Sequence, residues 1–325
     1  MASHHSAQPL LGIALKVAST LVFTAMATLI KLVSDRYPVG ELVFFRSFFA
    51  LLPVFIWVGW RDHTMRAVVD VFRTERLGSH IIRSVAGACG MFLGFAALTL
   101  LPIADATAIG YAAPLMSVVF AVLLLGEKVH VFRWSAVVIG LCGVLIMLSD
   151  YIGPESAGHE RSVAGALIAV SAAVVGALAS TYTRALTRYE AAATIVVYFS
   201  ALTALFGLAA LPLGWVWPAM AWVFPAPLDL AALVAAGICG GVAQVFLTQS
   251  YRFGDASTIA PFDYTSMIWV LIVSLVVFGS WPSATILIGT AIVIAAGLFV
   301  IWREHRLGIE RNRSKRAQTP TTPLS

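Results

Sequence analysis

The sequence predicts an all-α integral membrane protein whose ten transmembrane helices form two inverted five-helix repeats around a central cavity. Three observations predict this fold. Hydrophobic residues make up 60% of the 325-residue chain and charged residues only 11%, which leaves more apolar surface than a soluble core can hide. Ten apolar stretches reach about 20 residues, the length that crosses the hydrocarbon layer. A short sequence pattern in the first half also recurs in the second half.

The ten stretches follow one another with little chain between them. The longest remaining pieces are a loop at 61–78 and a tail from about 303, so no soluble domain is expected. In chain order, the predicted spans cover residues 10–33, 38–60, 79–101, 103–125, 130–149, 161–183, 191–213, 228–250, 255–278 and 282–302.

Two repeated motifs divide the spans into two groups of five. The pattern Ala-Gly-x-Cys-Gly occurs at 86–90 and again at 236–240. The pattern Asp-Ala-x-x-Ile occurs at 105–109 and again at 255–259. Because five is an odd number, two copies of a five-span unit face opposite ways in the membrane. Halves related in this way are typical of alternating-access proteins with a binding site between them.

The distribution of basic residues predicts the orientation. Cytoplasmic loops collect Lys and Arg, and most of the 21 such residues, Arg83 among them, fall on one side if the N-terminus is cytoplasmic. We therefore expect the cell inner (plasma) membrane, with both termini cytoplasmic. The net charge of +5 then reflects topology, and no nucleic-acid partner is expected. The predicted divisions are a cytoplasmic N-terminus at 1–9, a first repeat at 10–150, a second repeat at 161–303 and a disordered basic tail at 304–325.

Five short segments carry a resemblance to a known family. They are Val-Phe-Phe-Arg-Ser at 43–47, Leu-Leu-Pro-Ile-Ala-Asp-Ala at 100–106, Tyr-Ala-Ala-Pro at 111–114, Leu-Leu-Gly-Glu-Lys at 124–128 and Gly-Asp-Ala-Ser at 254–257. Together they resemble the drug/metabolite transporter superfamily, specifically its ten-span EamA-like branch, over nearly the whole chain. The resemblance implies a secondary carrier with a central cavity built mainly from spans other than the fifth and tenth.

The resemblance gives the class of function and not the substrate. The family moves amino acids, vitamins, nucleotide-like metabolites and toxic organic compounds. This chain departs from the family pattern at 278–281, where Phe-Gly-Ser-Trp replaces the acidic end of the fourth span. The resemblance therefore does not imply that Glu127 has a counterpart with the same role in the second half.

The energy source is expected to be a gradient or exchange. The chain has no Gly-x-x-x-x-Gly-Lys-Ser/Thr loop to hold ATP phosphates, and no span carries arginines at every third position. The three cysteines show no metal-type spacing, so no metal or cofactor is expected. We expect a secondary-active transporter of a small organic metabolite, coupled to a proton or sodium ion or to exchange. The alternatives are an exporter of amino acids or toxic organic compounds and, more remotely, an intramembrane enzyme or a membrane sensor.

Ionisable residues inside spans are candidates for the binding or coupling site, because burying a charge in hydrocarbon is costly. Asp263 lies roughly 12 Å deep in the ninth span and Lys16 roughly 9 Å deep in the first, measured from the same side, so these two can meet. Arg46 lies roughly 12 Å deep from the other side. Two cations against one acid would favour a carboxylate, phosphate or other anionic group on the substrate.

Each of these residues also has a structural interpretation. Lys16 can extend to the inner headgroups, and Arg46 can clamp backbone carbonyls or Glu41. Asp263 cannot easily reach the headgroups, so a coupling or binding role is favoured for it. Asp105 and Asp255 begin the fourth and ninth spans, where capping of the helix amides is the stronger interpretation.

Aromatic and amide side chains complete the candidate site. Tyr111, Phe262 and Tyr264 offer ring faces for a flat substrate such as a riboflavin-like vitamin or an aromatic amino acid. The alternative is that these rings fill helix interfaces. Gln244 in the eighth span either contacts the substrate or bonds a neighbouring helix.

Two prolines fall at nearly equivalent places in the two halves. Pro114 lies in the fourth span and Pro261 in the ninth. Each removes a backbone hydrogen bond and tends to kink a helix. A hinge that lets each half rock is favoured over a static bend.

Overall fold

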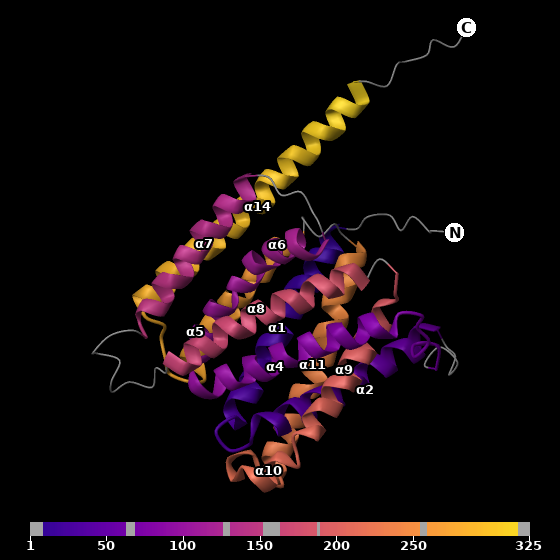
Figure 1. The fold of residues 1–325 in the computed structure, drawn as a ribbon, viewed down its shortest axis with the longest axis vertical. Coiled ribbons are helices and arrows are strands. Elements are labelled where there is room, and N and C mark those ends of the chain that lie inside the picture. The colour runs from indigo at the N-terminus through magenta and orange to yellow at the C-terminus, as the bar shows by residue number, and fades with distance from the viewer. Residues whose placement is uncertain are drawn as a thin grey trace.

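The structure is a computed structural model that describes residues 9–62, 69–125, 131–151, 163–186, 189–253 and 259–317. Over these ranges the chain is helical and contains no strand (Figure 1). Nine helices in the described part are long and apolar enough to cross a membrane, and the helical segment Phe262–Val276 is a shorter tenth. The predicted all-α membrane fold is therefore confirmed.

The helices follow the predicted spans closely. Within hydrocarbon each backbone amide must bond inside its own segment, so an apolar stretch of this length forms a helix. The first half contains α1 (Pro9–Val33), α2 (Val39–Asp62), α4 (Leu77–Leu100), α5 (Ile103–Gly110), α6 (Ala112–Leu125) and α7 (Val131–Ser149). The second half contains α8 (Val163–Leu186), α9 (Ala192–Ala209), α10 (Leu213–Val216), η2 (Pro218–Met220), α11 (Pro227–Phe253), η3 (Ala260–Tyr264), α13 (Thr265–Val276) and α14 (Ala284–Ala317).

The fourth predicted span is broken in the middle. The helix α5 ends at Gly110, Tyr111 forms a turn, and α6 begins at Ala112. Pro114 is the third residue of α6. A proline ring clashes with the carbonyl four residues before it, which here belongs to Gly110, so the break falls just ahead of the proline.

The ninth predicted span changes helix type within its described part. It opens in the described part with the 3₁₀ helix η3, which carries Pro261 in its first turn, and continues as the 12-residue α13. A proline is tolerated in a first turn because its missing N–H would have no partner there. Both prolines therefore lie where the helix of their span is interrupted or changes type. Their action as hinges stays a prediction.

The two halves run in opposite senses. Lys31, near the end of α1, donates from Nζ to the carbonyl of Leu98 near the end of α4, at 2.6 Å, so α1 and α4 share one direction. Arg83 near the start of α4 bonds Thr183 near the end of α8. Gly165 near the start of α8 lies beside the end of α4. The helix α8, which is the second-half counterpart of α1, therefore runs antiparallel to it.

Helix packing keeps the same pattern when the two halves are exchanged. The helix α1 packs on α11 and its counterpart α8 packs on α4, while α2 packs on α11 and α9 packs on α4. Equivalent helices also pair directly, α2 with α9 and α7 with α14, and the α7–α14 pair lies at one edge of the bundle (Figure 1). Two copies of one unit related by a twofold axis give this pattern.

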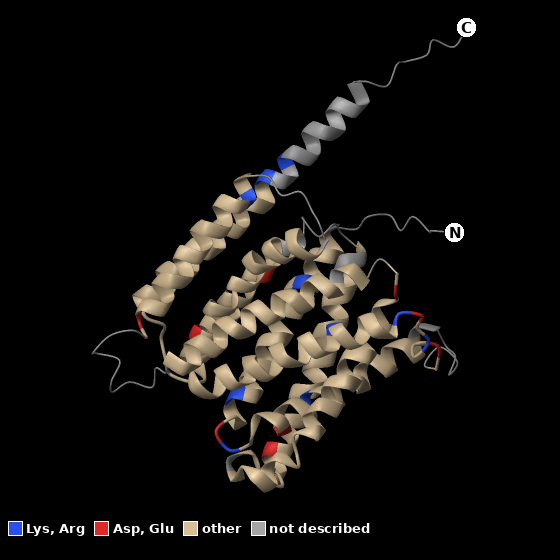
Figure 2. Cartoon of the chain, in the orientation of Figure 1, with Lys and Arg blue, Asp and Glu red and all other residues tan. Residues whose placement is uncertain are grey.

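The outer surface suits a lipid environment. Large apolar side chains are exposed along the spans, including Ile56, Leu123 and Leu145. Most turns of the helices carry no charged residue, and few charges lie within the bundle (Figure 2). Those few internal charges are therefore the groups whose burial needs an explanation.

The C-terminal segment differs from its prediction. The helix α14 continues to Ala317, so residues 304–317 are helical where disorder was expected. This stretch contains four Arg and two Glu, which have high helix propensity. Extending an existing helix also avoids the unfavourable nucleation step. Residues 1–8 and 318–325 lie outside the described residues.

Candidate functional site

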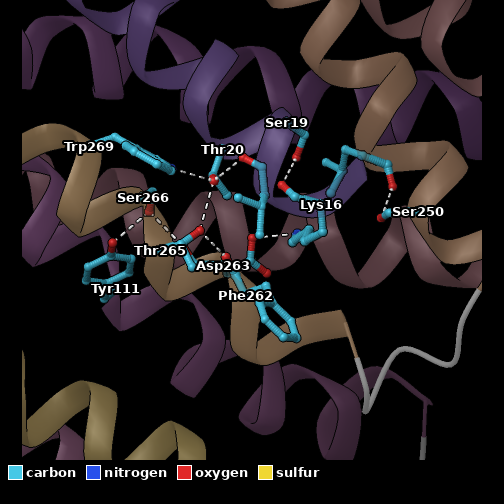
Figure 3. A network of polar contacts seen from close by, with 12 residues as sticks. Lys16, Ser19, Thr20, Tyr111, Ser250, Phe262, Asp263, Thr265, Ser266 and Trp269 are labelled. Atoms are coloured by element: carbon cyan, nitrogen blue, oxygen red, sulfur yellow. Dashed lines mark hydrogen bonds and ion pairs between the residues drawn. The ribbon is translucent and has the colours of Figure 1, made fainter. Parts of the chain in front are cut away.

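An ion pair between α1 and η3 lies at the centre of the polar contacts in Figure 3. Lys16 Nζ lies 2.5 Å from Asp263 Oδ1. The Lys16 side chain is 2% exposed, whereas the Asp263 side chain is 45% exposed. Lys16 therefore does not extend to the headgroups, and the structure brings it to Asp263 as expected. The pair is accessible from the carboxylate side.

Hydroxyl groups extend this contact along α1 and α13. Thr20 Oγ1 lies 3.0 Å from Thr265 Oγ1 and accepts a hydrogen bond from Trp269 Nε1 at 3.3 Å (Figure 3). Where η3 passes into α13, Ser266 Oγ donates to the Asp263 carbonyl at 2.7 Å. These bonds fix the turn that carries the Asp263 carboxylate toward Lys16.

Tyr111 and Tyr264 pack against each other. Their ring centroids are 5.4 Å apart in an edge-to-face arrangement, and both residues are buried. Tyr111 Oη hydrogen-bonds Ser266 Oγ at 2.7 Å, and Tyr264 rests on Gly297 of α14, which has no side chain to displace it. In this conformation both tyrosines fill a helix interface, and contact with a substrate stays a prediction.

Phe262 and Gln244 stand apart from the tyrosine pair. Phe262 directly precedes Asp263 and is partly buried. Gln244 on α11 is also partly buried, and its side chain makes no hydrogen bond to another described residue. Helix-to-helix bonding by Gln244 is therefore not observed within the described part, and its contact with a substrate stays a prediction.

Arg46 lies well away from the Lys16–Asp263 pair. On α2 its side chain is buried, and its Nε donates to Met26 Sδ at 3.5 Å. Met26 is about 15 Å along α1 from Lys16. The carboxylate of Glu41 accepts a hydrogen bond from the Val223 N–H at 3.1 Å and does not pair with Arg46. The structure therefore assigns Arg46 to a second centre.

Arg83 belongs to that second centre and was missed by sequence reasoning. The charge distribution assigns it to the cytoplasmic side, yet its side chain is buried within α4. Its Cζ lies 3.8 Å from the centroid of the Phe199 ring, and Arg46 Cζ lies 5.9 Å from the same centroid. The signal that identifies Arg83 is its position inside the apolar stretch 79–101.

Asp105 does not cap its helix as predicted. The residue that caps α5 is Pro102, without a side-chain hydrogen bond. Asp105 is the third residue of α5, and its Oδ2 accepts from Tyr151 Oη at 2.7 Å. The carboxylate still lies in the first turn, where it complements the helix dipole, but it ties α5 to the end of α7. Asp255 lies outside the described residues.

A further acidic residue joins the two halves at the opposite end of the bundle from Lys16. Asp229 Oδ2 lies 2.9 Å from Arg36 Nη1 and accepts a hydrogen bond from Tyr37 Oη at 2.8 Å. Burial raises the pKa of Tyr37 above its usual value, and the bond to Asp229 raises it further. No group of three or more His, Cys, Asp or Glu side chains that could hold a metal is found among the described residues.

Comparisons with known proteins show which family and which relatives this chain resembles. The model of the EamA-like transporter family matches residues 10–149. The S-adenosylmethionine uptake transporter of Rickettsia prowazekii is 26% identical over 288 residues, 88% of this chain and 90% of the relative. The riboflavin transporter of Rhizobium johnstonii is 32% identical over 242 residues, 74% and 76% of the two chains. The pseudopaline exporter of Pseudomonas aeruginosa is 26% identical over 287 residues, 88% and 94% of the two chains.

A solved crystal structure with 22% sequence identity matches with a TM-score of 0.62 over 91% of this chain and 98% of that chain. This match shows a common fold. The three relatives are named as transporters or exporters of small organic compounds and align over most of their lengths. The resemblance to the drug/metabolite transporter superfamily is therefore confirmed. The chain belongs to the EamA-like transporter family and is a multi-pass membrane transporter of small metabolites.

Proposed function

We propose that the protein is a secondary-active transporter that moves a small organic solute by alternating access. Residues 10–150 and 161–303 would be its two repeat units, and the binding cavity would lie between them. This mechanism is supported by the antiparallel course of α1 and α8. It is also supported by the helix packing, because each half repeats the contacts of the other.

The observation that carries the proposal is the ion pair between Lys16 and Asp263. It joins α1 of the first half to η3 of the second half. A buried lysine without a counter-ion is strongly unfavourable. Rocking of one half against the other must therefore either preserve this pair or replace it with another negative group.

Exchange of partners at this pair links substrate binding to coupling. The carboxylate of a solute can take the place of Asp263 beside Lys16, and Asp263 is then free to bind a proton, a sodium ion or the ammonium group of the same solute. Because Asp263 is half exposed and Lys16 is buried, Asp263 is the group that a coupling ion reaches. This exchange favours an anionic or zwitterionic substrate.

The proposed substrate is a planar solute of this kind, such as a riboflavin-like vitamin or an amino acid. The names of the relatives include a riboflavin transporter, an uptake transporter and an exporter. The family therefore contains proteins that work in both directions, and export of amino acids or toxic organic compounds is the second candidate.

The proposed location is the cell inner membrane with both termini cytoplasmic. The distribution of Lys and Arg supports this orientation. The partners in this proposal are the solute, the lipid bilayer and a coupling proton or sodium ion.

The proposal is tested with purified protein in proteoliposomes free of ATP. Uptake and efflux of a panel of vitamins, amino acids and nucleosides are measured with and without imposed pH or sodium gradients. We expect gradient-dependent transport that Asp263→Asn reduces, and an unchanged rate for the exposed control Asp70→Asn. Transport by Asp263→Asn with the wild-type rate and pH dependence would remove Asp263 from the mechanism, and a requirement for ATP would exclude a secondary carrier.

A further inference from the structure

Two arginine side chains lie against one aromatic ring inside the bundle. Arg83 and Arg46 place their Cζ atoms 3.8 Å and 5.9 Å from the centroid of the Phe199 ring. Their residues are only 7% and 3% exposed. The arginines come from α4 and α2 of the first half, and Phe199 comes from α9 of the second half. This group, the arginine centre, therefore spans the two halves.

The arginine centre carries two positive charges and no counter-ion from the described residues. None of the ion pairs found in the described part includes either guanidinium. Arg83 donates from Nε to Thr183 Oγ1 at 2.9 Å, while its Nη1 is buried without a hydrogen-bond partner. An aromatic ring attracts a cation but does not neutralise it, so the centre is electrostatically incomplete.

The repeated glycine motif leaves room for both guanidinium groups. A Cβ atom on Gly87 would lie 2.6 Å from the Phe199 ring and 3.1 Å from Arg83 Nη1. A Cβ atom on Gly240 would lie 2.9 Å from Arg46 Nε. Gly87 is the second residue of the motif copy at 86–90, whereas Gly240 is the fifth residue of the copy at 236–240. A guanidinium group therefore packs on each copy, at a different position of the motif.

We propose that the arginine centre binds an anionic group of the transported solute, a carboxylate or a phosphate, as a second anion site besides Lys16. This proposal rests on the transport function proposed above and names the substrate chemistry at a centre separate from Lys16 and Asp263. The free Nη1 of Arg83 donates to the anion, and the charge of the anion offsets both arginines. Guanidinium groups match the geometry of carboxylate and phosphate oxygens, and the Phe199 ring beside Arg83 holds that guanidinium in position.

The test measures anion binding by thermal unfolding and does not depend on transport. Protein is purified in an uncharged, phosphate-free detergent, and sodium benzoate or inorganic phosphate is titrated against sodium chloride at equal ionic strength, with benzamide as the neutral match for benzoate. We expect benzoate or phosphate to raise the Tm, because a ligand that binds only the folded state stabilises it, and benzamide to have no effect.

Variants locate the binding site. Arg83→Met and Arg46→Met should each weaken anion binding at least about tenfold, the loss expected when a charge-assisted hydrogen bond of this kind is removed. Arg83→Lys keeps the charge and should recover part of the binding. Arg73→Gln removes an exposed arginine that pairs with Asp70 and should bind as the wild type does.

Three results would overturn the inference. They are no anion-specific rise in Tm for the wild type, an equal rise in both methionine variants, and, in a parallel titration with phosphatidylglycerol, a rise produced by that lipid alone. The last result would assign the centre to a lipid headgroup. The failure of the transport proposal is recognised separately, because anion binding that depends on Arg83 can be present in a protein that moves no solute in proteoliposomes.

Discussion

Two centres hold charged groups inside the bundle, and they balance charge differently. In the first, the buried Lys16 is paired with Asp263, so one positive charge meets one negative charge. In the second, Arg46 and Arg83 lie against Phe199 without a carboxylate from the described residues. In the first, complete centre the charges are balanced without a ligand. In the second, incomplete centre they are balanced only when an anion binds. The same substitution, removal of one charge, should therefore have opposite consequences at the two centres.

The largest effect is expected from breaking the complete centre. Asp263→Asn removes the carboxylate that lies beside the buried Lys16, and breaking a fully buried pair in this way costs about 3–5 kcal/mol. Because Asp263 is half exposed, we expect a loss of about 2–3 kcal/mol in the free energy of unfolding. Reversible unfolding in mixed detergent measures it. Adding Lys16→Met to Asp263→Asn should recover most of the lost free energy of unfolding. A double variant as unstable as the single one would contradict the pairing.

A smaller loss is expected from filling the space beside the arginine centre. Gly87→Ala places a methyl group against Phe199 and Arg83, and overpacking of this kind costs about 1–3 kcal/mol. It should also weaken the rise in Tm with benzoate or phosphate. Gly94→Ala on the same helix meets nothing within 4 Å and is the matched control. Equal stability of the two variants would show that Gly87 is not closely packed.

A gain, or no change, is expected from removing a charge at the incomplete centre. Arg83→Met takes away an uncompensated buried charge and its repulsion with Arg46 while keeping a long apolar side chain. We expect the ligand-free free energy of unfolding to stay constant or rise by up to about 1 kcal/mol. The measurement is the same unfolding assay without anion. A loss as large as that of Asp263→Asn would mean that Arg83 is a structural clamp, and the contrast between the two centres would disappear.

The smallest effect is expected outside both centres, at Tyr37. Its raised pKa means that the folded state keeps the phenol proton at a pH where the unfolded state loses it. Stability from this group is therefore present below the usual tyrosine pKa of about 10 and is lost as the pH rises through the folded value. Tyr37→Phe should flatten the decline in Tm above that pH and leave anion binding unchanged. A decline identical to that of the wild type would remove Tyr37 as its source.

Much of the fold and part of the site can be predicted from the hydrophobicity, the motif spacing and the positions of charges along the chain. The ten apolar stretches predict the helices, and the depths of Lys16 and Asp263 predict that they meet. The same reasoning does not predict that Glu41 bonds Val223, that Asp105 bonds Tyr151, or that Tyr111 and Tyr264 pack together. These contacts join segments that are distant in the chain. Depth along the membrane normal restricts such partners but does not select them.

The sequence by itself determined the membrane class, the number and order of the apolar segments, and the duplication. These properties depend only on local hydrophobicity and on the spacing of motifs along the chain. The tertiary structure alone decided which charges are neutralised. Arg83 and Arg46 are far apart from Phe199 in sequence and become neighbours only when α2, α4 and α9 pack together. Charge balance inside the bundle depends on distances between helices, and those distances are set by packing.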